Sequence, residues 1–329
     1  MRRLIATLVA CAVALIALTV AGWYYLVALD RSHPADATQI IVPQGATLGD
    51  IAALLDEHGV ISNALAFRIL ARVEHHEADV RAGQYAFSPH ATQHEILDQL
   101  VTGGAQVAAW VTIPEGYTDD QIAERLAQDG VGRAAPFRAA FRSGTLDVDG
   151  TKIRGLEGFL FPSTYLVPLA ATPAQVIHQL TGQFFDELPP DAARRAKALG
   201  VTVPQAVTVA SLVEREAKID ADRPMIAGVI YNRLRLRMPL QVDATIEYAL
   251  PAHKSELSLG DLKIDSPYNT YLHAGLPPTP IANPGLPSLE AALSPAKTSA
   301  LYYVYCGNGH HVFANTLAEH QANVARCLK

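Results

Sequence analysis

The chain has 329 residues, of which 50% are hydrophobic and 18% are charged, so it can bury a substantial core and is not a disordered protein. Its formal net charge of −6 argues against a nucleic-acid-binding protein, because such proteins are normally basic. The length exceeds that of one ordinary domain and suits a membrane segment followed by two folded units.

The N-terminal segment has the sequence pattern of a membrane anchor. Arg2 and Arg3 precede 26 residues without a charge, 4–29. As a helix this run would be about 39 Å long, which is enough to cross a hydrocarbon core of about 30 Å. Because basic residues favour the cytoplasmic side, we expect residues 1–30 to comprise a cytoplasmic tip and a single-pass transmembrane helix in the inner (cytoplasmic) membrane. The N-terminus would then be cytoplasmic and all later residues extracytoplasmic. A cleaved signal peptide is the alternative, although its apolar region normally has about 7–15 residues.

A small α+β module is predicted over residues 39–104, after a polar linker at 31–38. The expected elements are a strand at 39–42, a helix that begins after Thr47 and stops at Gly59, a helix at 63–73, a strand at 84–87 and a helix from Thr92 to Leu100. Thr47 and Thr92 are each followed three residues later by an acidic residue, which is the spacing of a capping box. Small peptidoglycan-binding modules have about this size and order, but many other small α+β units share them.

Residues 105–329 are expected to form one larger α+β domain. The predicted elements are a strand at 107–113, a helix from Thr118 to Gln128, a helix that begins at Thr172, a short helix at 191–199, a helix that begins at Thr202, and a hairpin of 301–306 with 310–313. Cys306 and Cys327 both belong to this domain. An oxidising compartment would allow them to pair, and the sequence leaves open whether they are bridged or remain thiols.

The helix at 205–218 carries an acidic residue in an unusual position. At about 100° per residue, the apolar side chains centred on Val209 form one stripe, and Glu216 lies within about 20° of its centre. A carboxylate on a buried stripe must be paired with a cation, hydrogen-bonded or protonated. Burial raises the pKa of a carboxyl group, so Glu216 could donate a proton near neutral pH.

The same helix allows a purely structural interpretation. Glu216 could form an ion pair with Arg223 or Arg233, or lie where the helix end leaves the core. By the same rotation, Glu214 points about 140° away from the stripe and Lys218 about 180° away. Because these two residues are four apart, we expect an ordinary ion pair on the solvent-exposed side of the helix.

Six segments of the chain, taken in order, form a more specific pattern. They are IPEGYT (113–118), LEGFLFPSTY (156–165), ASLVEREA (210–217), VIYNRLRLRMPLQVDATIEYAL (229–250), SPYNTYLHAGLPPTPIANPG (266–285) and SLEAALSPAKTSALYYV (288–304). In this order they resemble the motifs of the YceG-like family of endolytic murein transglycosylases. The resemblance covers nearly the whole chain, including the anchor and a LysM-like module at 39–104. Cys306 is a departure from the family pattern.

The resemblance implies that Glu216 is the catalytic acid and base, on a lysozyme-like helix of the α+β domain at 105–329. The implied reaction cleaves the MurNAc–GlcNAc bond of peptidoglycan, and the 6-hydroxyl of the MurNAc attacks its own C1 to leave a 1,6-anhydro end. One carboxyl group is sufficient for this reaction, whereas hydrolysis normally uses two. The resemblance also implies that six residues line the substrate cleft: Glu157, Gln241, Asp243, Asn269, Tyr271 and Asn283.

Other functions are compatible with some of the same residues. Asp243 could be the second carboxylate of a lysozyme-type hydrolase. A non-catalytic peptidoglycan-binding scaffold would need only the anchor and the small module. Asp243 and Asn269 could also be turn residues that hydrogen-bond their own backbone.

No metal or cofactor is implied by the sequence. It contains no H-E-x-x-H, Walker A or dinucleotide-binding motif, and adjacent residues such as His310 and His311 point to opposite faces of a strand. The expected partners are peptidoglycan glycan strands and, by the resemblance, peptidoglycan synthases (penicillin-binding proteins). Cleavage beside such a synthase would terminate growing strands.

The predicted anchor fixes the side of the membrane on which the C-terminus lies. A reporter enzyme that folds only outside the cytoplasm should therefore be active when it is fused after Lys329. Activity of a cytoplasm-specific reporter at the same position, or a mature N-terminus near residue 22, would contradict this topology.

Overall fold

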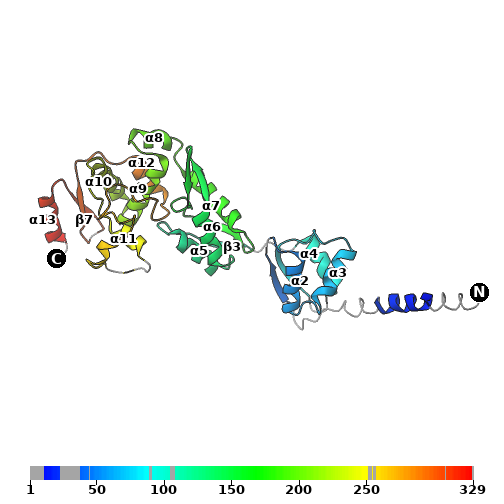
Figure 1. Ribbon diagram of the computed structural model, residues 1–329. Coiled ribbons are helices and arrows are strands. Elements are labelled where there is room, and N and C mark those ends of the chain that lie inside the picture. The colour runs from blue at the N-terminus through cyan, green and yellow to red at the C-terminus, as the bar shows by residue number, and fades with distance from the viewer. Residues whose placement is uncertain are drawn as a thin grey trace, which may run out of the picture. The chain divides into compact units, whose positions relative to one another are not determined.

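The computed structural model describes residues 11–22, 38–43, 45–88, 91–103, 108–250, 254, 257–307 and 309–327. The chain divides into two compact units, one of Met1–Ala109 with Val167–Thr172 and one of Trp110–Leu166 with Pro173–Lys329. Helices and two-stranded sheets make up both units (Figure 1), which confirms the predicted α+β class.

The predicted membrane span lies largely outside the described residues. Of residues 4–29, the structure describes an apolar helix at Cys11–Gly22. In the described part of the chain, no single helix is long and apolar enough to cross a bilayer. A pair of helices that meet at 84°, Ala192–Ala198 and Val203–Glu216, has that length and composition only when the two are taken together.

Between residues 38 and 102, the first unit contains five elements in the predicted order. They are β1 (Thr38–Val42), α2 (Leu48–Glu57), α3 (Ala64–Val73), β2 (Gly83–Phe87) and α4 (Gln93–Thr102). Both predicted capping boxes form, at Thr47 and Thr92. The two strands pair antiparallel with Ile40 opposite Tyr85, and alternate residues of β2 are buried because only one face of the sheet packs on the helices. A separate hydrophobic core results.

The rest of the chain forms the second unit and the strands β3 and β6, whose residues are shared between the units. The elements are β3 (Ala108–Thr112), α5 (Asp119–Gln128), α6 (Ala134–Ser143), β4 (Thr145–Val148), β5 (Thr151–Arg154), β6 (Thr164–Pro168), α7 (Pro173–Glu187), α8 (Ala192–Ala198), α9 (Val203–Glu216), η1 (Asp220–Asp222), α10 (Arg223–Arg235), α11 (Asp243–Ala249), η2 (Asp261–Lys263), α12 (Leu286–Leu293), β7 (Tyr302–Tyr305), β8 (His311–Ala314) and α13 (Leu317–Cys327). The strands pair as β3 with β6, β4 with β5, and β7 with β8.

Helix α9 is the centre of the second unit. It begins with a capping box between Thr202 and Gln205, and it contacts α8, α10, α11 and α12 (Figure 1). Every residue from Ala206 to Val213 is buried, so the predicted division into an apolar side and a solvent-exposed side is wrong for this helix. The polar residues Thr208 and Ser211 can be buried because their hydroxyls bond main-chain groups.

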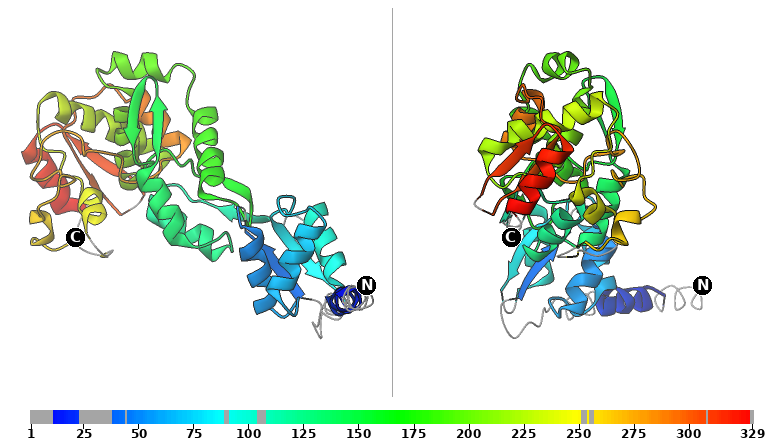
Figure 2. Two further views of the ribbon diagram at one scale, coloured as in Figure 1. Left: turned by 45° about the vertical axis from the view of Figure 1, so that its right-hand side comes forward. Right: turned by 90° about the vertical axis from the view of Figure 1, so that its left-hand side faces the viewer.

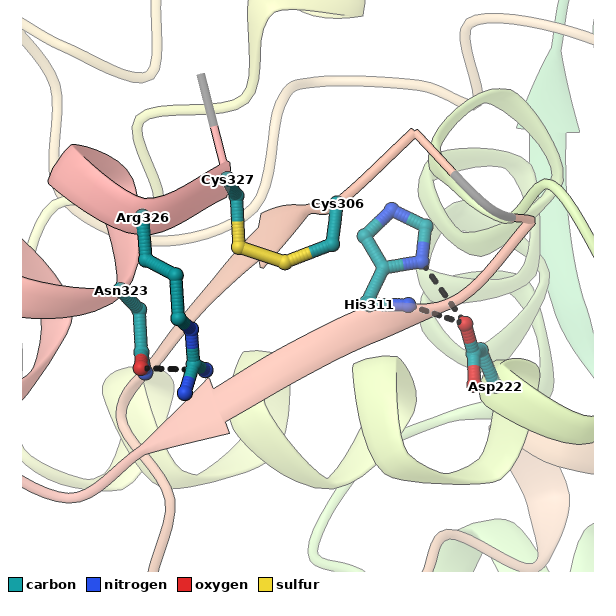
Figure 3. Close-up of a disulfide and its surroundings, with 6 residues drawn as sticks. All are labelled: Asp222, Cys306, His311, Asn323, Arg326 and Cys327. Atoms are coloured by element: carbon teal, nitrogen blue, oxygen red, sulfur yellow. Dashed lines mark hydrogen bonds and ion pairs between the residues drawn. A yellow bond between two sulfur atoms is a disulfide. The ribbon is translucent and has the colours of Figure 1, made fainter. Parts of the chain in front are cut away.

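The C-terminal elements form a cross-linked substructure. Strands β7 and β8 make the predicted hairpin, with Tyr305 opposite His311, and α13 packs on both strands (Figure 2). Cys306 follows β7 directly and forms a disulfide with Cys327 at the end of α13, with the two Cα atoms 4.5 Å apart (Figure 3). The pairing that the sequence left open is therefore present, and it ties the last helix to the hairpin.

Removal of this disulfide should destabilise the second unit. The two cysteines are separated by 21 residues, and closing a loop of that size stabilises a fold by up to about 3 kcal/mol. The double variant Cys306→Ser/Cys327→Ser should melt at a lower temperature than the parent, whereas Cys11→Ser should not change the melt. Thiol labelling of both Cys306 and Cys327 in denatured, non-reduced protein would show that the bridge does not form.

Candidate active site

Glu216 is the last residue of α9, where the buried helix reaches a pocket. Its Oε2 accepts a hydrogen bond of 3.0 Å from the hydroxyl of Tyr303 on β7. Burial raises the pKa of Glu216 to about 7, the Tyr303 hydrogen bond lowers it, and the Asp243 carboxylate raises it. Near neutral pH this carboxyl group can therefore both donate and accept a proton.

The pocket around Glu216 has a volume of about 560 Å³. One group of its lining residues comes from β7, β8 and α13, and another comes from α11 and the residues just before it. Three of the predicted cleft residues belong to this lining: Gln241, Asp243 and Tyr271. The Tyr271 hydroxyl donates to Oδ1 of Asp243, which connects two segments that are 28 residues apart.

Asn269 is placed differently from its neighbour Tyr271. It is fully buried, and its side-chain amide donates to the carbonyl oxygens of Leu262 and Ile264. Its Oδ1 accepts the backbone N–H of Tyr271 at 2.9 Å. These are the contacts of a residue that shapes its own loop, so Asn269 holds the segment that brings Tyr271 to the pocket.

Glu157 and Asn283 lie in a second polar cluster. Asn283 is fully buried and donates to the Tyr117 carbonyl at 3.0 Å and to Oδ1 of Asp119 at 3.1 Å. Glu157 accepts the backbone N–H of Asp119 at 3.1 Å and the Tyr248 hydroxyl at 3.2 Å. The sequence analysis missed Asp119 and Tyr248. Asp119 lies in the segment from Thr118 to Gln128, which was used only to predict a helix.

This second cluster borders a pocket of about 540 Å³. Burial raises the pKa of Asp119 to about 7 and holds that of Glu157 well above its ordinary range. Arg215, Ala244 and Glu247 line both this pocket and the one around Glu216, so the two hollows are neighbours within the second unit. Of the six predicted cleft residues, Gln241, Asp243 and Tyr271 line the Glu216 pocket and Glu157 lines the second pocket, whereas the fully buried Asn269 and Asn283 line neither.

Glu214 is not the surface residue that was predicted. Its side chain is only 6% exposed and pairs at 3.1 Å with Arg223, whose side chain is 9% exposed. The other carboxylate oxygen accepts the backbone N–H of Gly285 at 3.0 Å. The prediction of an exposed pair with Lys218 is wrong because α10 begins with Arg223 and α12 follows Gly285, and these helices occupy the side of α9 that the helical rotation assigned to solvent.

Glu216 does not form the ion pair with Arg223 or Arg233 that was the structural alternative to catalysis. Arg223 pairs with Glu214, and Arg233 donates to the carbonyl oxygens of Leu301 and Leu240. Within the described residues, Glu216 forms no ion pair. Burial of Glu216 is therefore accommodated by a raised pKa and by one hydrogen bond, and not by a cation.

The local sequence does not indicate that β7 and β8 form a wall of the pocket. Tyr303 is 87 residues from Glu216 along the chain, and nothing near Tyr303 indicates which element it faces.

Among the residues that the structure describes, no group of three or more His, Cys, Asp or Glu side chains is arranged to hold a metal ion.

Comparisons with known proteins agree on one family. The sequence profile of the YceG-like family matches residues 40–326. A Bacillus subtilis protein named endolytic murein transglycosylase is 36% identical over 85% of this chain and 82% of its own length. A Streptococcus pneumoniae protein of the same name is 33% identical over 94% of this chain, which spans 63% of that relative. The crystal structure of a putative yceG-like protein from Listeria monocytogenes matches with a TM-score of 0.59 and 34% identity, over 88% of this chain and 99% of that one. The chain therefore belongs to the YceG-like family.

Proposed function

We propose that this protein is an endolytic lytic transglycosylase of peptidoglycan and that Glu216 is its catalytic residue. The relatives from Bacillus subtilis and Streptococcus pneumoniae carry the name of this activity. The observation that carries the proposal for this chain is the carboxyl group of Glu216, with a pKa of about 7, on the wall of an open pocket. A group of this kind can protonate a leaving glycosidic oxygen at neutral pH.

The reaction that we propose uses Glu216 twice. The protonated carboxyl group gives its proton to the oxygen of the MurNAc–GlcNAc bond, and the bond from that oxygen to C1 breaks. The 6-hydroxyl of the MurNAc then bonds to C1, and its proton passes to the Glu216 carboxylate, which leaves a 1,6-anhydro end. The Tyr303 hydroxyl stabilises the intermediate carboxylate through its hydrogen bond.

Substrate contacts follow from the same pocket. Gln241, Asp243 and Tyr271 would bind the sugars next to Glu216, and Asn269 would act by ordering the Tyr271 loop. Glu157 would line the adjoining pocket, and Asn283 would hold Glu157 in place through its side-chain amide. A second pocket suits a polymer longer than the sugars at the cleaved bond.

A lysozyme-type hydrolase is the second candidate, and one observation favours it. The carboxylate of Asp243 lies in the same pocket as Glu216 and could activate a water molecule. Mass spectrometry of digested glycan strands distinguishes the products: anhydro ends support transglycosylation, reducing ends support hydrolysis, and uncut strands would indicate a non-catalytic scaffold.

The cellular setting is also part of the proposal. Residues 1–30 would anchor the protein in the cytoplasmic membrane, 31–38 would link the anchor to a LysM-like module at 39–104, and the catalytic domain at 105–329 would act outside the cytoplasm on strands made by penicillin-binding proteins. Cleavage there would terminate nascent chains. If deletion of the gene left the average glycan chain length unchanged, this role would be excluded.

The two glutamates at the end of α9 predict opposite phenotypes. Glu216→Gln should reduce cleavage by about 10²–10⁴-fold or more, because the amide cannot transfer the proton, and its melting temperature should not fall. Glu214→Gln should lower the free energy of unfolding by about 2 kcal/mol or more, because it leaves the Arg223 guanidinium buried with a weaker partner. The assays are anhydro-end formation and thermal melts on both variants. A Glu216→Gln enzyme that still cleaves would exclude this residue as the acid.

The raised pKa of Glu216 predicts the pH dependence of cleavage. The acid must be protonated to act, so activity should fall as the pH rises through about 7. Tyr303→Phe removes a hydrogen bond that lowers this pKa, so the alkaline limb of the pH profile should move to higher pH.

A matched control for this shift is Tyr305→Phe. The Tyr305 hydroxyl accepts a hydrogen bond from the backbone N–H of Gly309, so the alkaline limb of the pH profile should not move in this variant. If the limb moved to lower pH in Tyr303→Phe, the assignment of the limb to Glu216 would be wrong.

A further inference from the structure

A buried aspartate holds a histidine on the wall of the Glu216 pocket. Asp222, at the end of η1, accepts the backbone N–H of His311 at 2.7 Å and lies 2.9 Å from Nδ1 of the His311 ring (Figure 3). The side chains of Asp222 and His311 are only 10% and 4% exposed. One carboxylate oxygen therefore fixes both the main chain and the ring of this residue.

This contact determines which ring nitrogen of His311 is available. A carboxylate accepts hydrogen bonds, so Nδ1 carries the hydrogen, and in the neutral ring Nε2 is left as an acceptor. Figure 3 shows Nδ1 turned to Asp222 and Nε2 on the other side of the ring. Among the described residues, no hydrogen-bond partner for Nε2 is found, although His311 lines the pocket.

The position of His311 connects it with Glu216. Its ring packs edge-on against Tyr303, with centroids 5.7 Å apart, and is tilted by 55° against Tyr305, with centroids 5.5 Å apart. Tyr303 donates to Glu216. The lining residues from α11 and just before it include Gln241 and Asp243. His311 therefore places a hydrogen-bond acceptor on the hairpin wall of the pocket that Gln241 and Asp243 also line.

We propose that His311 is a substrate-binding residue of this pocket, whose Nε2 accepts a hydrogen bond from a sugar hydroxyl of the glycan, and that Asp222 is the positioning residue that fixes its tautomer. The inference rests on the proposed function, because it takes the ligand of the Glu216 pocket to be a saccharide. Sugar hydroxyls are donors that an unpaired imidazole nitrogen can accept. A hydrogen bond between neutral groups contributes a modest free energy. We therefore expect its loss to weaken glycan binding more than it slows the chemical step.

Two substitutions at His311 distinguish the role of Nδ1 from the role of Nε2. The side-chain amide of Asn reaches about as far as Nδ1, so His311→Asn can keep the contact with Asp222 and loses the Nε2 position. The amide of Gln reaches about as far as Nε2, so His311→Gln keeps an acceptor there. Asp222→Ala removes the oxygen that accepts the Nδ1 hydrogen, so the ring is no longer fixed in the tautomer with an acceptor at Nε2. His178→Asn is the matched control, because His178 is exposed on α7 and does not line the pocket.

The probe is a preparation of glycan strands freed of stem peptides, with full-length protein in detergent and Glu216→Gln in every variant to prevent cleavage. His311→Asn and Asp222→Ala should bind these strands about tenfold more weakly than the parent, and His311→Gln and His178→Asn should bind within about threefold of the parent. Equal binding by His311→Asn and the parent would overturn the proposal.

A spectroscopic measurement keeps the test decisive if a variant fails to fold. In histidine labelled with ¹⁵N, the Nε2 resonance of His311 should move when strands are added, whereas a merely structural histidine would not respond. An unchanged resonance under saturating strands would also overturn the proposal. Failure of the proposed function is a different result, namely cleavage that persists in Glu216→Gln with His311 intact.

Discussion

A carboxylate that loses its contact with water must be compensated, and α9 ends with two of them in its last turn. Glu214 is compensated by Arg223 and by the N–H of Gly285, which ties α9 to the starts of α10 and α12. Among the described residues, Glu216 has one side-chain hydrogen-bond partner, the Tyr303 hydroxyl, and burial raises its pKa to about 7. The same desolvation thus yields a structural ion pair at one residue and a proton donor two residues later. The surrounding helices and the hairpin are required for both outcomes.

Interactions between residues close in sequence were predictable. The capping boxes at Thr47, Thr92, Thr118 and Thr202 form as their spacing indicates, because each needs only a partner three residues away. Helix α6 was not predicted, and its N-cap residue, Arg133, makes no side-chain cap. The burial of Glu214 was predicted wrongly because its partner Gly285 is 71 residues away. Rotation about a helix axis indicates which residues share a side, but not whether another helix covers that side.

In the candidate site, too, the sequence did not indicate which side chains are covered by distant parts of the chain. Glu216 was singled out by its position on an apolar stripe, although the helix proved to be buried on all sides. Asn269 and Tyr271 belong to one short motif, yet one is buried under its own loop and the other lines the pocket. Tyr303 and His311 could not be placed, because the hairpin that carries them reaches Glu216 only through the tertiary fold. Family resemblance identifies such motifs, but the direction of each side chain depends on the packing.

The disulfide has a consequence for the energetics of substrate binding. The hairpin contributes Tyr303 and His311 to the pocket, and α13 contributes Leu317 and His320. A bridge from Cys306 to Cys327 joins these two elements covalently. A wall that is fixed during folding loses little further conformational entropy when a ligand arrives, so preorganisation of the pocket would depend on thiol oxidation. In a reducing environment the same residues would have to be ordered by the glycan itself, and binding would be weaker without the loss of a single contact.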